Sequence, residues 1–281
     1  MEFVIITGFS GSGKSSAVNA LEDIGYYCID NIPPVLIKDF ANLCMKTESL
    51  DKVAVVTDTR GGDFFADFVS VVAELKKIGL DFKILFLETS PHKLVTRYKE
   101  TRRKHPLAEK SDGSIEESVK LEEKLLQPVK ELADYIVIMS YDEHYSGSKE
   151  AGSVASLSWV KEGIEGMLEK VPSEKIVNGM PFYTRIWEEK DGKLSSRALG
   201  MEDSWNEMNL NNAETIWVED FGQTYAEYER DGATYRSWLE DAKSTEERMK
   251  LIGEYGLAGV SCWRLGFEKA DVWNTIVKYV N

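Results

Sequence analysis

Hydrophobic positions in the first half of the chain fall into short unbroken runs separated by amphipathic stretches. Such runs are typical of strands buried on both faces, and they cover Phe3–Thr7, Tyr26–Ile29, Val53–Thr57, Phe82–Leu87 and Tyr135–Met139. Helical periodicity between them predicts helices over 15–24, 64–78 and 115–132, the first two ended by Gly25 and Gly79. This alternation predicts an α/β fold with a parallel sheet.

The second half continues the alternation less regularly. We expect helices over Leu157–Val171, Thr245–Tyr255 and Ala270–Val280 and strands over Lys175–Met180 and Gly259–Leu265. The stretch Trp187–Trp238 shows no clear period and is predicted to be irregular. If Tyr135–Met139 pairs on both sides, the parallel sheet continues into the second half with about seven strands. Its outer edge would then be covered by Trp187–Trp238 or by a second copy, which would make a homodimer.

Composition separates the same two halves. All seven tryptophans follow residue 136, and the acidic excess is larger in the second half than in the first. We therefore predict two domains, 1–136 and 137–281. The net charge of −14 disfavours non-specific binding to nucleic acid or anionic lipid. No apolar run is long enough to span a membrane, and no basic segment precedes Phe3–Thr7, so we expect a cytoplasmic protein.

A glycine-rich loop between the first strand and the first helix carries the strongest chemical signal. Gly8-Phe9-Ser10-Gly11-Ser12-Gly13-Lys14-Ser15 fits the Walker A pattern G-x-x-x-x-G-K-[ST] in the strand–loop–helix context that the pattern requires. Glycines let backbone N–H groups surround a phosphate at the helix N-terminus. Lys14 would reach the β- and γ-phosphates, and the Ser15 hydroxyl would bind Mg²⁺. The alternative is a chance glycine-rich turn.

Two further motifs follow strands of the same predicted sheet. Asp58-Thr59-Arg60-Gly61 ends a buried strand, where Asp58 is placed to hold the Mg²⁺ shell or a water; the alternative is a surface turn with a capping aspartate. After the fourth strand, Arg97, Arg102 and Arg103 occupy the position where P-loop kinases keep a phosphate-clamping lid. A solvated basic helix end would give the same pattern.

These motifs together resemble the N-terminal domain of the RapZ/YvcJ family of bacterial nucleotide-binding proteins. The likeness rests on GFSGSGKSSAVNALEDIGYYCIDNIPP, VTDTRGG and RYKETRRKHPL, which occur in this order. It implies binding and weak hydrolysis of ATP and GTP, with Gly8–Ser15 as the ATP site and Asp58–Gly61 as a GTP-associated element. RapZ delivers a regulatory RNA to a ribonuclease through a separate C-terminal domain. This chain contains no segment resembling that domain, so an RNA partner is not expected.

The second half resembles the last strand–helix units of a family 18 glycoside hydrolase barrel of the spore-cortex-lytic type. The likeness rests on MSYDEHYSG, NGMPFYTRIW and GVSCWRLGFE. It implies that Tyr141 and Asp142 touch an N-acetyl sugar, that Tyr183 and Arg185 line the cleft, and that Trp263 floors the subsite. The acid of the family's D-x-x-D-x-D-x-E motif is missing, because no aspartate here is followed two residues later by glutamate.

Three interpretations follow from these patterns. The first is a P-loop protein that binds ATP or GTP with Mg²⁺ and whose sheet is continued by a catalytically incomplete partial barrel. The second, from another class, is a carbohydrate-binding protein derived from a hydrolase, for N-acetylglucosamine polymers or peptidoglycan. The third is a fusion without an evolved function.

Overall fold

The computed structural model describes residues 1–47, 49–60, 65, 67–91, 93–95, 98, 104–111 and 113–280. By its internal contacts the chain divides into two compact units, Met1–Ile138 and Met139–Asn281. Among the described residues, no helix is both long and apolar enough to cross a membrane.

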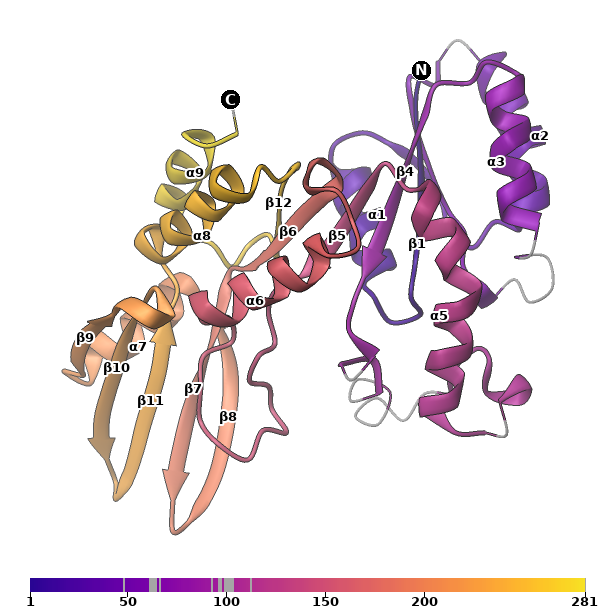
Figure 1. Ribbon diagram of the computed structural model, residues 1–281. Coiled ribbons are helices and arrows are strands. Elements are labelled where there is room, and N and C mark those ends of the chain that lie inside the picture. Colours follow the sequence, from indigo (N-terminus) through magenta and orange to yellow (C-terminus); the bar gives the residue numbers. More distant parts are fainter. Residues whose placement is uncertain are drawn as a thin grey trace. The chain divides into compact units, whose positions relative to one another are not determined.

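Parallel strands and the helices between them build the first unit (Figure 1). The strands are β1 (Glu2–Gly8), β2 (Tyr27–Ile29), β3 (Lys52–Val56), β4 (Phe82–Glu88) and β5 (Tyr135–Met139). The helices are α1 (Lys14–Asp23), α2 (Pro34–Met45), α3 (Phe68–Lys77), the 3₁₀ turn η2 (Ala108–Lys110) and α5 (Ile115–Leu132). Helix α2, which begins on Pro34, was not predicted from the sequence.

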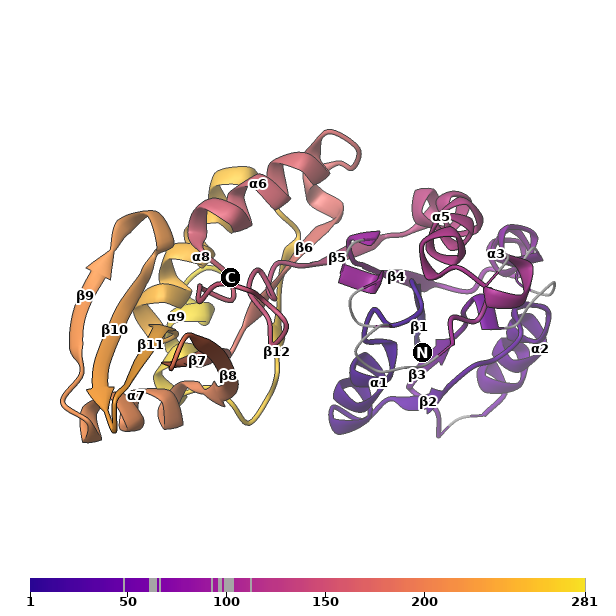
Figure 2. The same cartoon turned by 90° about the horizontal axis from the view of Figure 1, so that it is seen from below.

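Strand β1 lies at the centre of this unit. It pairs with β3 on one side and with β4 on the other, which gives the order β2-β3-β1-β4-β5. Helix α1 covers one face of the sheet, and α2, α3 and α5 lie together on the other (Figure 2). This order brings the carboxyl ends of β1 and β3 side by side. In open α/β sheets such a point is where ligands bind.

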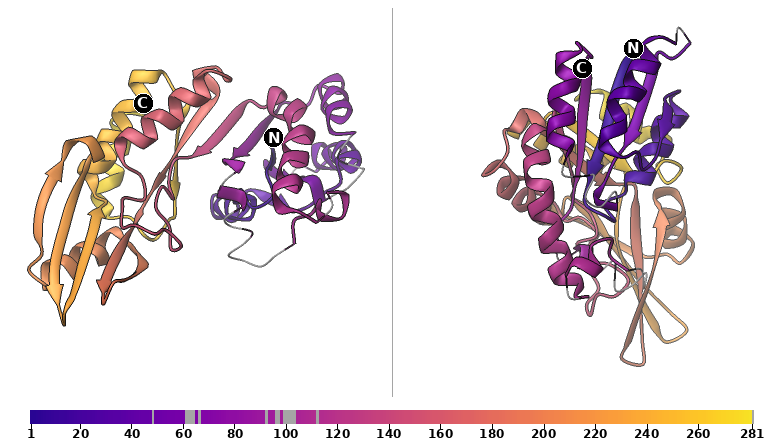
Figure 3. Two further views of the ribbon diagram at one scale, coloured as in Figure 1. Left: turned by 60° about the horizontal axis from the view of Figure 1, so that its bottom comes forward. Right: turned by 90° about the vertical axis from the view of Figure 1, so that its right-hand side faces the viewer.

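The second unit combines parallel strands with an antiparallel sheet (Figure 3). Strands β6 (Ile176–Pro181) and β12 (Gly259–Trp263) pair in parallel. The antiparallel sheet contains β7 (Tyr183–Lys190), β8 (Lys193–Gly200), β9 (Glu214–Val218), β10 (Gln223–Arg230) and β11 (Ala233–Leu239). The helical segments are α6 (Leu157–Leu168), η3 (Ser173–Lys175), α7 (Met201–Leu210), η4 (Glu219–Phe221), α8 (Ala242–Tyr255) and α9 (Ala270–Val277).

The prediction of an irregular segment over Trp187–Trp238 is wrong. This stretch forms most of the antiparallel sheet, whose order is β8-β7-β11-β10-β9, together with helix α7. Helix α7 buries Met208 against Ile186, Ala226 and Leu239 of the sheet. The stretch therefore has its own hydrophobic core.

The predicted fold class is confirmed. The first unit holds parallel strands in the order β2-β3-β1-β4-β5, the second unit holds the parallel pair β6-β12, and the antiparallel sheet of the second unit is separate from that pair. Strand β12 is an edge of the parallel sheet. A homodimer through this edge stays a prediction.

Candidate functional site

The glycine-rich loop between β1 and α1 adopts a conformation that requires glycine. Gly8, Gly11 and Gly13 have φ angles of 132°, 90° and 88°, which L side chains rarely adopt. A Cβ atom on Gly8 would lie 2.3 Å from the Leu87 carbonyl oxygen of β4. The loop can therefore fold tightly over the sheet and lead directly into α1. At the start of that helix the Ser16 and Ala17 N–H groups donate to the Gly13 carbonyl oxygen. The N–H groups of Lys14 and Ser15 have no acceptor within the helix.

The Lys14 side chain lies beneath this loop and is 6% exposed. Its Nζ donates to the carbonyl oxygens of Gly8 (2.9 Å) and Phe9 (2.8 Å) and lies 3.5 Å from Asp58 Oδ2. Burial lowers the pKa of Lys14, and the negative charges of Asp58 and Glu122 oppose that shift. The amine is thus held by weak acceptors and one carboxylate, beside the loop that the sequence assigns to phosphate.

Asp58 and Arg60 form the second wall of the site. The Arg60 Nε donates to both carboxylate oxygens of Asp58, at 3.1 and 2.8 Å, and the Arg60 backbone N–H donates to Oδ1 at 2.9 Å. Burial alone would raise the pKa of Asp58, but these hydrogen bonds and the Lys14 charge lower it below its ordinary value. Asp58 is therefore an anion held between two cations.

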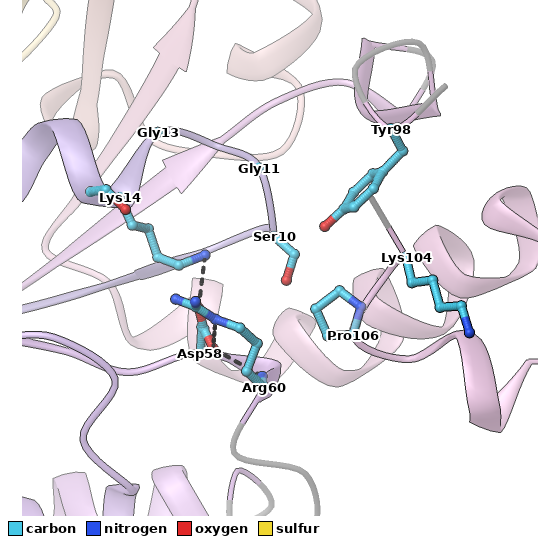
Figure 4. A pocket seen from close by; sticks show the side chains of 10 residues that line it. Ser10, Gly11, Gly13, Lys14, Asp58, Arg60, Tyr98, Lys104 and Pro106 are labelled. Atoms are coloured by element: carbon cyan, nitrogen blue, oxygen red, sulfur yellow. Dashed lines mark hydrogen bonds and ion pairs between the residues drawn. The ribbon is translucent and has the colours of Figure 1, made fainter. Parts of the chain in front are cut away.

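These groups line one pocket of about 510 Å³ (Figure 4). Lys14 and Arg60 both point at Asp58, and Tyr98 stands across the cavity with its hydroxyl towards Ser10. The pocket is lined by Ser10, Gly11, Gly13, Lys14, Ser15, Asp58, Arg60, Tyr98, Lys104 and Pro106.

The remaining residues predicted for this site lie elsewhere. Gly8, Phe9, Ser12 and Thr59 do not line the pocket. Phe9, Ser12 and Thr59 are buried, and the Phe9 ring packs edge-on against Phe86 of β4. Gly61 and the three arginines predicted to form a lid (Arg97, Arg102 and Arg103) lie outside the described residues. A phosphate-clamping role for these arginines therefore stays a prediction.

Sequence reasoning missed a buried carboxylate directly behind the pocket. Glu122 of α5 has no exposed surface. Its Oε1 accepts from the Ser10 backbone N–H (3.0 Å) and from Thr59 Oγ1 (2.6 Å), and its Oε2 lies 3.1 Å from His105 Nε2. The His105 ring in turn lies 4.9 Å from the Tyr98 ring, between centroids. One carboxylate therefore joins the loop, the Asp58 wall and the Tyr98 wall.

We predict that the first unit loses stability in acid through Glu122. Burial would raise the pKa of Glu122, but hydrogen bonds from His105, Thr59 and Ser10 lower it below its ordinary value. A carboxylate with a lowered pKa stabilises the fold at neutral pH, and this contribution is lost as the pH falls below 4.5, its ordinary value.

Thermal unfolding followed by circular dichroism at pH 7, 5 and 3 tests this prediction. The stability gap between the wild type and Glu122→Gln should narrow towards pH 3. Glu123→Gln, which changes an exposed residue of the same helix, should follow the wild type throughout. A gap that is constant over the whole range would contradict the prediction.

In the second unit, three of the five predicted sugar contacts lie together. The hydroxyl of Tyr183, at the start of β7, donates to Asp142 Oδ1. The rings of Tyr141 and Tyr183 meet edge to face, with centroids 6.4 Å apart. Burial, followed by the charge of Asp142, raises the pKa of Tyr183 well above its ordinary value, so its hydroxyl remains protonated.

The other two predicted contacts have partners of their own. Arg185 donates from Nε to Ser196 Oγ of β8 at 3.0 Å and lies over the Trp187 ring. Trp263, at the end of β12, is 37% exposed, and its carbonyl oxygen accepts from the Phe182 N–H at 2.6 Å. Trp263 is thus the most open aromatic surface among the five predicted residues.

A parallel sheet whose first strand ends in a glycine-rich loop over a buried lysine defines the nucleotide-binding class of α/β proteins. The chain belongs to the family of the RapZ-like N-terminal domain, which matches residues 1–144. It is 41% identical over 208 residues to a nucleotide-binding protein of Halothermothrix orenii, an alignment that covers 69% of this chain and 72% of that protein.

A nucleotide-binding protein of Caldicellulosiruptor bescii is 49% identical over 138 residues, which cover 49% of this chain and 47% of that protein. The chain spans about half the length of this relative. The predicted resemblance of the first half is confirmed at the level of the family.

Solved structures resemble the chain in fold. The C-terminal domain of a putative chitinase from Desulfitobacterium hafniense superposes with a TM-score of 0.62 at 19% identity, over 96% of this chain and 83% of that one. The spore cortex-lytic enzyme SleL of Bacillus megaterium superposes with a TM-score of 0.55 at 17% identity, over 100% of this chain and 74% of that one. The resemblance to chitinase-like proteins is thus confirmed for the fold, and at such identities the likeness shows the fold alone.

Proposed function

We propose that the first unit binds ATP or GTP with Mg²⁺ in the pocket between the glycine-rich loop and Asp58. The observation that carries the proposal is the position of Lys14, buried under the loop and 3.5 Å from Asp58 in the same pocket. Arg60 supplies a second cation from the opposite wall. Two cations and the amides at the start of α1 together provide what a polyphosphate requires.

The residues present fit a magnesium ion that arrives with the nucleotide. Ser15 lies in the first turn of α1, is exposed and lines the pocket. Mg²⁺ takes most of its ligands from phosphates and water and few from protein. No cluster of three or more metal-binding side chains occurs in the described part of the chain. Asp58 can join the Mg²⁺ shell once phosphate oxygens draw Lys14 and Arg60 away from it.

Hydrolysis by this site should be weak. Asp58 is the one carboxylate among the described residues that line the pocket, and Arg60 and Lys14 hold it as an anion with a lowered pKa. A carboxylate that is weakly basic and already bonded to two cations is a poor general base for the attacking water. We therefore propose binding as the main activity, with slow turnover as its consequence.

Filter binding with labelled nucleotides tests the proposal. ATP and GTP should bind in the presence of Mg²⁺, EDTA should weaken both, and adenosine and guanosine should bind far more weakly, because the pocket is built for phosphate. Nucleosides that bind as tightly as the triphosphates would contradict a phosphate site.

The hydrogen bond from Tyr183 to Asp142, beside Tyr141, favours a second candidate function for the other unit, which is sugar binding without cleavage. A protonated tyrosine, a carboxylate and an aromatic ring are typical of a site that holds a polar ligand with an apolar face. Trp263 offers a further stacking surface. Binding of N-acetylglucosamine oligomers to the full chain would support this candidate, and identical titrations for the wild type and Trp263→Ala would count against it.

We expect no cleavage of chitin oligomers or peptidoglycan. No aspartate is followed two residues later by glutamate, so the acid that protonates the glycosidic oxygen is missing. Product analysis after prolonged incubation should show intact substrate. Turnover that persists through purification and falls in Tyr141→Phe would prove this prediction wrong.

A further inference from the structure

Glu122 is placed where one carboxylate can fix both walls of the pocket. Through Oε1 it holds the Ser10 backbone N–H and the Thr59 hydroxyl, and through Oε2 it faces His105. Ser10 lines the pocket from the loop side. Pro106 follows His105 in the chain, and the Tyr98 ring lies tilted against the His105 ring; both Pro106 and Tyr98 line the opposite side.

The tautomer of His105 makes its contact with residue 122 specific for a carboxylate. The Leu107 backbone N–H donates to His105 Nδ1 at 3.1 Å, so in a neutral ring the proton sits on Nε2 and points at Glu122 Oε2. A glutamine at position 122 can keep its oxygen towards Ser10 and Thr59. Its NH₂ group then meets the Nε2–H of His105, and two donors face each other.

The bond from Glu122 also determines which backbone amides are free for a ligand. The Ser10 N–H points at Glu122, and the Ser12 N–H donates to the Phe9 carbonyl oxygen at 3.0 Å. Phosphate would therefore be bound by amides later in the loop, at the start of α1 beside Lys14. Because the loop is already fixed in this conformation, its amides can bind phosphate without reorganising. Such preorganisation lowers the cost of ordering on binding and so increases affinity.

We propose that Glu122 is the positioning residue of the nucleotide site, acting on the phosphate loop through Ser10 and Thr59 and on the facing wall through His105. The inference rests on the proposed nucleotide function. Glu122 itself does not line the pocket and touches the ligand only through the residues that it holds.

The test compares ATP affinity in variants of the full chain whose folding is checked by thermal unfolding. Glu122→Gln should bind ATP about 10-fold more weakly, the scale of one lost charge-assisted hydrogen bond. Glu123→Gln removes the same charge from an exposed position of α5 and should match the wild type. His105→Phe keeps a ring beside Tyr98 but loses the donor, and it should weaken binding as Glu122→Gln does.

The pair Glu122→Gln with His105→Phe should bind no more weakly than either single variant, because both break the same link. His105→Gln restores a donor and should return affinity to within about 3-fold of the wild type. Additive losses, or a Glu122→Gln variant that binds like Glu123→Gln, would overturn the positioning role. If Lys14→Ala weakens binding while Glu122→Gln does not, only this inference fails. If the wild type does not bind ATP, both proposals fail.

Discussion

Replacement of Lys14 by alanine is expected to weaken the binding of ATP and GTP by about 10- to 100-fold. A charge-assisted hydrogen bond is worth about 1.5–3 kcal/mol. In the free protein the Lys14 amine is bound to the carbonyl oxygens of Gly8 and Phe9 and paired with Asp58. When a nucleotide binds, its phosphate oxygens replace these weak acceptors of the Lys14 amine as stronger ones. The alanine variant has no amine and cannot form these hydrogen bonds.

The fold should tolerate this substitution, because Asp58 retains the hydrogen bonds from Arg60. Lys38→Ala is the matched control, since the side chain of Lys38 in α2 is 38% exposed and pairs with Glu74. We expect Lys38→Ala to bind both nucleotides like the wild type in filter-binding titrations. A folded Lys14→Ala protein with unchanged affinity would remove the basis for the nucleotide site.

The parallel sheet and the loop could be predicted because their signals are local. Unbroken apolar runs identify buried strands. The glycines at positions 8, 11 and 13 indicate a loop with positive φ angles, because other residue types rarely adopt them. The convergence of Lys14 and Asp58 also follows from the sequence once both are placed at carboxyl ends of neighbouring strands. Local pattern and topology suffice for this part of the site.

Glu122 and His105 were missed because their role depends on contacts over long sequence separations. Ser10 and Glu122 are 112 residues apart. A signal was nevertheless present, since Glu122 falls on the same helical face as Val119, Leu126 and Val129, all of which are buried. A charged residue within the apolar stripe of a helix indicates a buried, satisfied carboxylate.

The antiparallel sheet was missed although its turns are visible in the sequence. The dipeptides Asp191-Gly192 and Asp231-Gly232 connect β7 to β8 and β10 to β11, and all four residues have positive φ. An Asp-Gly pair between alternating strands is a strong hairpin signal. Trp187–Trp238 looked aperiodic because residue type does not follow burial in these strands. Small or polar residues such as Ala226, Ala233 and Ser237 are buried, whereas the aromatic residues Tyr225 and Trp238 are only half-buried at alternate positions.

The largest effect on stability is expected from Arg248→Met in the second unit. Arg248 of α8 is 1% exposed and donates to both oxygens of Glu240, at 2.8 and 2.9 Å. It also donates to the carbonyl oxygens of Ser244 and Ala155. Removing one partner of a buried ion pair leaves an uncompensated charge, which costs about 3–5 kcal/mol.

The cost should depend on pH. Burial already raises the pKa of Glu240 to about 7, although Arg248 and Ser244 lower it. Without Arg248 the folded-state pKa rises further, while the unfolded value stays at the ordinary 4.5. Between these values the folded state binds more protons than the unfolded state, so the stability of the variant falls as the pH rises. Arg248→Met should therefore lose more stability at pH 8 than at pH 5.

Tryptophan fluorescence during denaturant unfolding of the full chain measures this effect, because all seven tryptophans lie in the second unit. Arg197→Met is the matched control, since the Arg197 side chain is 49% exposed and pairs with Glu207 at the surface. Exposed pairs contribute about 0–1 kcal/mol, so this control should change the unfolding free energy little. Two outcomes would contradict the prediction: an equal loss of unfolding free energy in both variants, or a loss for Arg248→Met that does not grow between pH 5 and pH 8. Either would show that burial of the Glu240 charge does not control the stability of this unit.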